Sequence, residues 1–188
     1  MAVTINADTT TGAAVVTADA SGVLALQSAG TTAITLQSGN TAIAQKLTAT
    51  GTASIAGLKI ADVLETVTIS ATAATGTIAY DVTTQAVMYY TTNASANWTV
   101  NFRGSSGTSL NTLMATGESV TVAFLVTQGA TAYYNNVVQV DGSSVTPKYQ
   151  GGTAWTAGNA SGIDVYTYTI IKTGNAAFTV LASQTKFA

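Results

Sequence analysis

The chain has 188 residues, of which 47% are hydrophobic and only 7% are charged, and its net charge is −2. An ordinary soluble domain carries about 25% charged residues, so we expect copies of this chain to cover much of one another's surface. The six basic residues never cluster, which argues against a nucleic acid or an anionic membrane surface as the partner. The absence of Cys and His excludes disulfides, Ser-His-Asp and Cys-His catalytic sets, and the usual Cys/His zinc sites.

The beginning of the chain differs sharply in composition from the rest. All aromatic residues lie at or after Tyr80, and residues 1–60 are rich in Ala, Thr, Ser and Gly. The opening string MAVTINADTT has neither the basic nor the apolar region of a signal peptide. No apolar run is long enough to span a membrane. We therefore expect a protein that is made in the cytoplasm, with no membrane insertion.

Residues 1–60 are predicted to form an extended assembly segment of short strands. The triplet Leu-Gln-Ser recurs at residues 26 and 36, and Gly residues punctuate the stretch. Each buried methylene contributes about 0.8 kcal/mol, whereas ordering a residue costs about 1–2 kcal/mol. The segment should therefore form trimers or dock on a partner rather than fold alone. Its apolar positions for this role are Leu24, Leu26, Ile34, Leu36 and Ile43.

Residues 61–188 are predicted to form an all-β domain, an antiparallel β-sandwich or jelly roll. Apolar residues alternate with polar ones in several stretches, as they do in half-buried strands, and turn residues separate the stretches roughly every ten positions. A single helical turn is expected over 110–114. The one-sided stripes are Ile78-Tyr80-Val82, Trp98-Val100-Phe102 and Val120-Val122-Phe124-Val126, and further strands are expected over 137–140, 165–171 and 178–181.

Acidic residues are the only candidates left for catalysis, because glycoside cleavage needs just two carboxyl groups. Asp62 and Glu65 are close in sequence, but strand alternation does not bring them together. Asp141 precedes Gly142, which is the usual composition of a tight turn. We expect no catalytic residue, no metal site and no cofactor.

Aromatic residues are the better candidates for a binding surface. Tyr and Trp are favoured at protein interfaces and at surfaces that stack on sugars. In a strand, adjacent residues point to opposite faces, so one member of each adjacent Tyr pair should face outward or toward a neighbour. Packing in the core or between subunits is the alternative. The candidates for ligand or interface contact are Tyr133, Tyr134, Tyr149 and Trp155.

Several strings resemble virion structural proteins of tailed phages, especially phages of cyanobacteria and other marine bacteria. IDVYTYTIIKTGNAAFTVLASQTKFA, VDGSSVTPKYQGG and QAVMYYTTNASANWTVNFRG are similar to parts of tail-fibre-like proteins, and SGVLALQSAGTTAITLQSGNTAI resembles N-terminal or shaft repeats of fibres. The resemblance implies a virion component that is trimeric and has no catalytic residues.

The sequence therefore predicts a non-enzymatic structural protein of a tailed-phage virion. A trimeric fibre or tail-appendage subunit is the first hypothesis, with other virion proteins and a host surface glycan as possible partners beside the chain itself. A capsid decoration protein is the second hypothesis. A glycan-degrading enzyme like some tailspikes and a bacterial surface adhesin are weaker alternatives, and the adhesin lacks an export signal.

Overall fold

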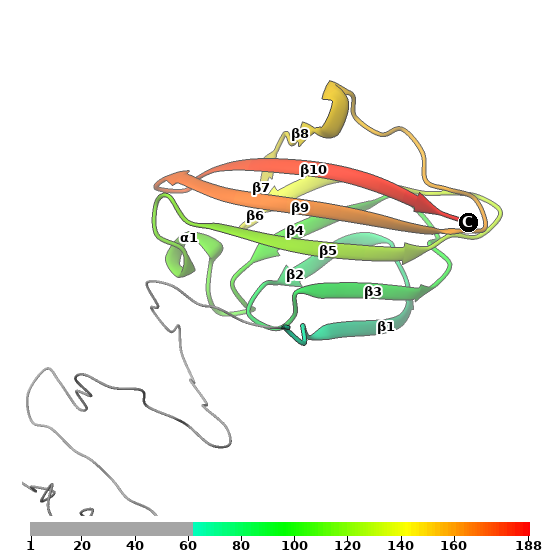
Figure 1. Ribbon diagram of the computed structural model, residues 1–188, viewed down its shortest axis with the longest axis horizontal. Coiled ribbons are helices and arrows are strands. Elements are labelled where there is room, and N and C mark those ends of the chain that lie inside the picture. The colour runs from blue at the N-terminus through cyan, green and yellow to red at the C-terminus, as the bar shows by residue number, and fades with distance from the viewer. Residues whose placement is uncertain (1–61) are drawn as a thin grey trace, which may run out of the picture. The chain divides into compact units, whose positions relative to one another are not determined.

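A computed structural model of the chain describes residues 62–188, and these residues form two β-sheets that pack face to face (Figure 1). The predicted all-β fold is confirmed. Its one α-helix has four residues, within the helical turn expected over 110–114. The predicted assembly segment of residues 1–60, with its five apolar positions, lies outside the described residues.

The six-stranded sheet, here called sheet A, has the order β1-β3-β5-β9-β10-β8, and the four-stranded sheet B has the order β2-β4-β6-β7. The elements are β1 (Val67–Ala73), β2 (Gly76–Asp81), β3 (Val87–Thr92), β4 (Trp98–Arg103), α1 (Leu110–Leu113), β5 (Ser119–Thr127), β6 (Asn135–Val140), β7 (Ser143–Val145), β8 (Lys148–Tyr149), the 3-10 turn η1 (Gln150–Gly152), β9 (Ile163–Gly174) and β10 (Ala177–Phe187).

The prediction of a wholly antiparallel sandwich is wrong. From β1 to β6, each strand lies in the opposite sheet from the one before it, so strands two apart in sequence become neighbours and run parallel. The connections β1–β2, β3–β4 and β5–β6 carry the chain across to the other sheet. Only β5, β9 and β10 in sheet A and β6 and β7 in sheet B pair antiparallel.

The tight hairpin between β6 and β7 forms where the local backbone favours it. Asp141 and Gly142 have φ values of 50° and 81° and join β6 to β7. Positive φ at both central residues is the requirement of the hairpin turn that follows the right-handed twist of strands, and Asp-Gly is a preferred pair for it. The Asp141 carboxylate also accepts hydrogen bonds from the backbone N–H groups of Leu110 and Asn111, at 2.6 and 2.9 Å. The hairpin therefore also fixes the start of α1.

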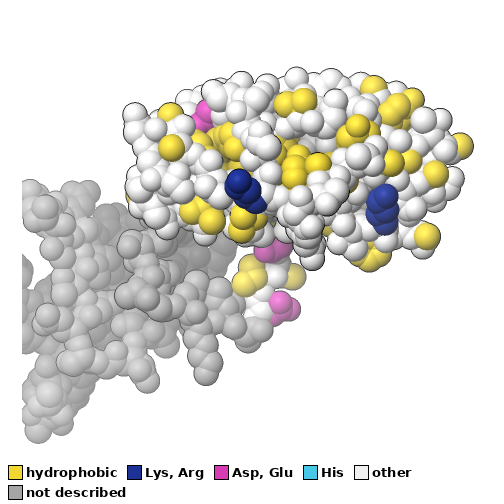
Figure 2. Space-filling model, turned by 90° about the horizontal axis from the view of Figure 1, so that it is seen from above, with side chains coloured by type: hydrophobic (Ala, Val, Ile, Leu, Met, Phe, Trp, Pro, Cys, Tyr) yellow, Lys and Arg dark blue, Asp and Glu magenta, His cyan; other side chains and the backbone are white. Residues whose placement is uncertain are grey.

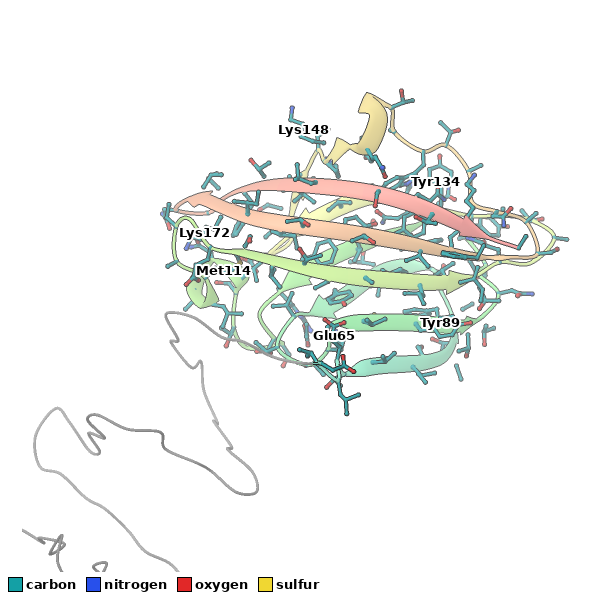
Figure 3. All side chains as sticks on the ribbon, viewed as in Figure 1. Glu65, Tyr89, Met114, Tyr134, Lys148 and Lys172 are labelled. Carbon is teal, nitrogen blue, oxygen red and sulfur yellow. The ribbon has the colours of Figure 1, made fainter. Side chains whose placement is uncertain are left out.

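The other end of α1 is fixed by a buried lysine. The Nζ of Lys172 donates to the backbone oxygens of Asn111 and Met114, at 2.5 and 2.8 Å. Figure 3 shows Lys172 and Met114 close together at one end of the domain. A cation beside the last carbonyl groups of a helix satisfies acceptors that have no partner within the helix.

The core between the sheets is built on aromatic side chains from both. The ring of Trp98 in β4 stacks on Phe124 in β5, with 5.8 Å between centroids, and meets Tyr166 in β9 edge to face at 5.6 Å. Phe102 packs on Tyr168 at 4.9 Å. All five of these side chains are fully or almost fully buried. The stripes expected at Trp98-Val100-Phe102 and Val122-Phe124-Val126 therefore face the core.

Truncation of this layer should be costly. Phe124→Ala should lower the free energy of unfolding by about 3–5 kcal/mol, because it removes a fully buried ring and leaves a cavity between the sheets. Urea unfolding followed by Trp fluorescence measures the change. Thr185→Ala on the exposed part of β10 is the control and should change stability by less than about 0.5 kcal/mol. Equal effects of the two substitutions would contradict this placement of the core.

Candidate functional site

A groove lies beside β8, at one edge of sheet A. Its larger part has a volume of about 380 Å³ and adjoins a second hollow of about 200 Å³. The two hollows share four lining residues, so they form one continuous groove. The shared residues are Tyr149, Gln150, Ala182 and Ser183, the first hollow adds Lys148, Thr167, Thr169 and Leu181, and the second adds Thr153, Trp155 and Gln184.

The groove is shaped by the chain segment that overhangs the sheet. β8 pairs with β10 over only two residues, after which Gly151 and Gly152 adopt φ values of 73° and 77° and turn the chain. A side chain at either position would strain the backbone. Trp155 then returns to the domain, where its Nε1 donates to the backbone oxygen of Asn135 at 2.6 Å. The segment is thus attached at both of its ends.

Two of the four predicted site aromatics meet at this groove. Tyr149 and Trp155 pack edge to face with 4.8 Å between centroids. Trp155 in turn packs on Tyr166 of the core at 5.1 Å, so both rings are partly buried. Burial also raises the pKa of the Tyr149 phenol above its ordinary value. A role for these rings in ligand or subunit contact stays a prediction.

The other two predicted aromatics lie in the loop between β5 and β6. Both are half-buried and pack against the core. The backbone N–H of Tyr133 donates to Gln128 and that of Tyr134 donates to Asn97, each at 3.0 Å. No ring contact joins them to Tyr149 or Trp155 within residues 62–188. The four aromatics therefore do not form a single cluster.

The outer face of sheet A is a second candidate surface. The register aligns two rows across five strands, and every side chain in them is uncharged. Tyr89 faces outward here (Figure 3), whereas its neighbour Tyr90 stacks on Phe124 in the core, as the alternation of adjacent residues requires. The rows are Val67-Val87-Ala123-Thr167-Ser183 and Ile69-Tyr89-Leu125-Val165-Thr185.

The apolar side chains in these rows are incompletely covered. Ile69 is 68% exposed, and Val67 and Leu181 on the same face are each exposed by nearly half. Lys148, at the β8 edge, is the one charged residue whose register position lies on this face. Figure 2, which views the domain from above as it stands in Figure 1, shows basic side chains only as separate groups among uncharged ones.

The outer face of sheet B carries charged and amide side chains. Asp81 and Arg103 occupy one register position and form an ion pair there, which is the only ion pair between described residues. Asn101 and Gln139 lie side by side at the next position. Sheet B therefore has a pair of charges and two amides on its outer face, whereas the two rows on sheet A have no charged side chain.

The residues that lead into β1 form a third exposed feature, here called the leading segment (Asp62–Val67). All six residues are exposed, and Leu64 is 99% exposed while Val63 is 56% exposed. Asp62 and Glu65 place two carboxylates among these apolar side chains. Figure 3 shows Glu65 at the opposite edge of the domain from Lys148, in agreement with the strand order of sheet A.

Asp164 is the most unusual ionisable group of the domain. It is fully buried, and its Oδ2 accepts hydrogen bonds from Gln128 Nε2 at 2.9 Å and from the backbone N–H of Asn159 at 3.0 Å. Its Oδ1 has no hydrogen-bond partner among the described residues. Burial raises the pKa of this carboxyl above its ordinary value. The cluster joins the loop before β9 to the loop after β5.

Three further acids of the domain serve local structure. Asp81 pairs with Arg103, Asp141 holds the start of α1, and Glu118 accepts from the backbone N–H of Ala115 at 2.8 Å. The described residues contain no group of three or more acidic, His or Cys side chains that could hold a metal ion.

None of the helices between residues 62 and 188 has the length and hydropathy that a membrane crossing requires. Comparison of the chain with protein-family models, with curated proteins and with solved structures gives no match. The resemblance to virion proteins therefore stays a prediction.

Sequence reasoning missed two features that the structure brings out. The groove unites Lys148 with Leu181 through a parallel pairing that no local pattern indicates. The second feature is the buried carboxyl of Asp164. Its position in the alternation with Tyr166 and Tyr168 was the signal that its side chain faces the core.

Asp164 should make stability depend on pH. The folded chain binds a proton at this carboxyl more tightly than the unfolded chain does. Its contribution to the free energy of unfolding therefore falls as the pH rises from about 4 through the raised pKa. Asp164→Asn keeps an oxygen acceptor and removes the charge. Urea unfolding from pH 3.5 to 7.5 should show the variant gaining stability relative to the unsubstituted chain as pH rises. Asp62→Asn, at an exposed position, should show no such gain, and parallel curves for Asp164→Asn would contradict the assignment.

Proposed function

We propose that the chain is a non-enzymatic structural protein of a tailed-phage virion and that it works as a homo-oligomer, with a trimeric fibre or tail-appendage subunit as its specific role. The observation that carries the proposal is the uncharged, partly apolar outer face of sheet A. A monomer in water normally covers such a sheet face with polar and charged side chains.

A second copy of the same chain is the partner that this face fits. A charged partner surface would lose hydration against it without gaining an ion pair, whereas an equally neutral surface loses little. The low charge of the whole chain makes such neutral surfaces abundant. Sheet B, with its ion pair and amides, would remain in water.

The structural engagement of three of the acids supports a role without catalysis. A pair of carboxyl groups that cleaves a glycosidic bond must be free to meet the substrate. Asp81, Asp141 and Glu118 are each engaged in hydrogen bonds that fasten strands, a helix or a turn.

The virion setting rests on the resemblance of the sequence strings to phage fibre proteins. Immunogold labelling of phage particles would place the chain on the tail, as a fibre subunit requires, or on the capsid, as the decoration hypothesis requires.

The oligomeric state is directly testable. Light scattering on the purified full chain at micromolar concentration should give the mass of a homotrimer or a higher oligomer. Leu125→Lys places a charge in the middle of the outer face of sheet A and should lower that mass. Thr77→Lys, on the exposed face of sheet B, is the matched control and should leave it unchanged. A stable, folded monomer of the unsubstituted chain would refute the proposed oligomer.

A further inference from the structure

Two exposed features at opposite edges of sheet A are complementary in shape and charge. The leading segment, next to β1, presents Leu64 and Val63 as uncovered apolar side chains. The groove beside β8 presents a hollow of about 380 Å³ with Leu181 in its wall. A cavity of about 150 Å³ accommodates a molecule as large as benzene. The hollow therefore has room for an aliphatic side chain such as that of Leu64.

The charges at the two edges are opposite. Asp62 and Glu65 flank the apolar side chains of the leading segment, while Lys148 stands on the wall of the groove. The single ion pair between described residues is the one on sheet B, so Glu65 and Lys148 have no ionic partner within this part of the chain. The strand order separates them by the full width of sheet A, and Figure 3 shows them at opposite edges of the domain.

We propose that the leading segment of one copy docks into the β8–β10 groove of the next copy, with Leu64 in the hollow and Glu65 facing Lys148. The inference rests on the proposed homo-oligomer and specifies its contact. The proposed contact is heterologous, made once between each copy and the next, and successive copies joined by such a contact close into a ring or continue as a filament. A closed ring of three is the form that agrees with a trimeric subunit.

The groove and the outer face of sheet A belong to one surface. Thr167 and Ser183, in the groove wall, occupy the same register row as Val67 at the other edge. A neighbour seated in the groove would therefore also approach the uncharged rows. One contact can thus account for both the exposed apolar side chains and the lack of charge.

A heterologous contact is tested by complementation between two defective variants. Leu64→Lys removes the apolar side chain of the leading segment but leaves the groove intact. Leu181→Glu places a negative charge in the groove, where it repels Asp62 and Glu65, but leaves the leading segment intact. Each variant alone should sediment as a monomer of about 18.9 kDa. An equimolar mixture should form dimers of about twice that mass, because one intact groove can then meet one intact leading segment.

Controls separate loss of the contact from loss of the fold. Thr77→Lys changes an exposed residue of sheet B, outside the groove and outside the outer face of sheet A, and it should keep the oligomer of the unsubstituted chain. Thermal unfolding should be cooperative for all variants. A charge exchange gives a second measurement: Glu65→Lys should weaken association, and adding Lys148→Glu should restore it.

The outcomes distinguish this contact from the proposed function. If the unsubstituted chain is a monomer, the proposed oligomer itself is refuted. If it is an oligomer that survives Leu64→Lys and Leu181→Glu, the oligomer stands and the docking of the leading segment is overturned. If both variants are folded monomers but their mixture stays monomeric, the contact is not heterologous and the proposal is likewise overturned.

Discussion

The contact between Trp98 and Phe124 is the interaction on which the rest of the domain depends. It joins the middle of sheet B to the middle of sheet A, and Tyr166 meets the same indole edge to face. Aromatic pairs of this kind contribute about 0.5–1.5 kcal/mol beyond the burial of their area. From Tyr166 the packing continues to Trp155 and Tyr149, so the same layer of rings also supports the overhang that shapes the groove.

This layer also explains why the chain can alternate between sheets. A strand that crosses to the opposite sheet does not form a hairpin with the strand before it in sequence. Side-chain packing between the sheets must therefore help to hold it in place. β2 and β4 are held in this way, because Tyr80 and Phe102 are fully buried and their rings lie 5.4 Å apart. The Tyr80 hydroxyl, in addition, donates to the backbone oxygen of Ala86 at 2.7 Å, which joins β2 to the start of β3 across the sheets.

The sequence could predict the features that depend on neighbouring residues, but not those that depend on contacts between distant parts of the chain. The inward stripe of β5 and the Asp141-Gly142 hairpin were predictable, because alternation and turn chemistry are local. The sheet to which each of the other turns leads could not be predicted. A reversal of the chain after Ala73 fits either a hairpin within one sheet or a crossing to the other sheet. The pairing of Lys148 with Leu181 likewise joins residues far apart in sequence over a very short strand.

The distribution of charge in sheet A is the reverse of the usual one. Asp164 and Lys172 lie on its buried side, where each charge requires hydrogen bonds to be tolerated. On the outward side a charge would cost little free energy, yet Lys148 at the edge is the only charged residue there. Solubility alone would favour the opposite arrangement, with Lys or Glu among the exposed Thr and Val residues. An outward face that stays neutral while the interior accepts charge is what a sheet needs if its outer side is covered in the assembled protein. In the contact that we propose, the lysine at one edge and the carboxylates at the other set the direction in which copies join.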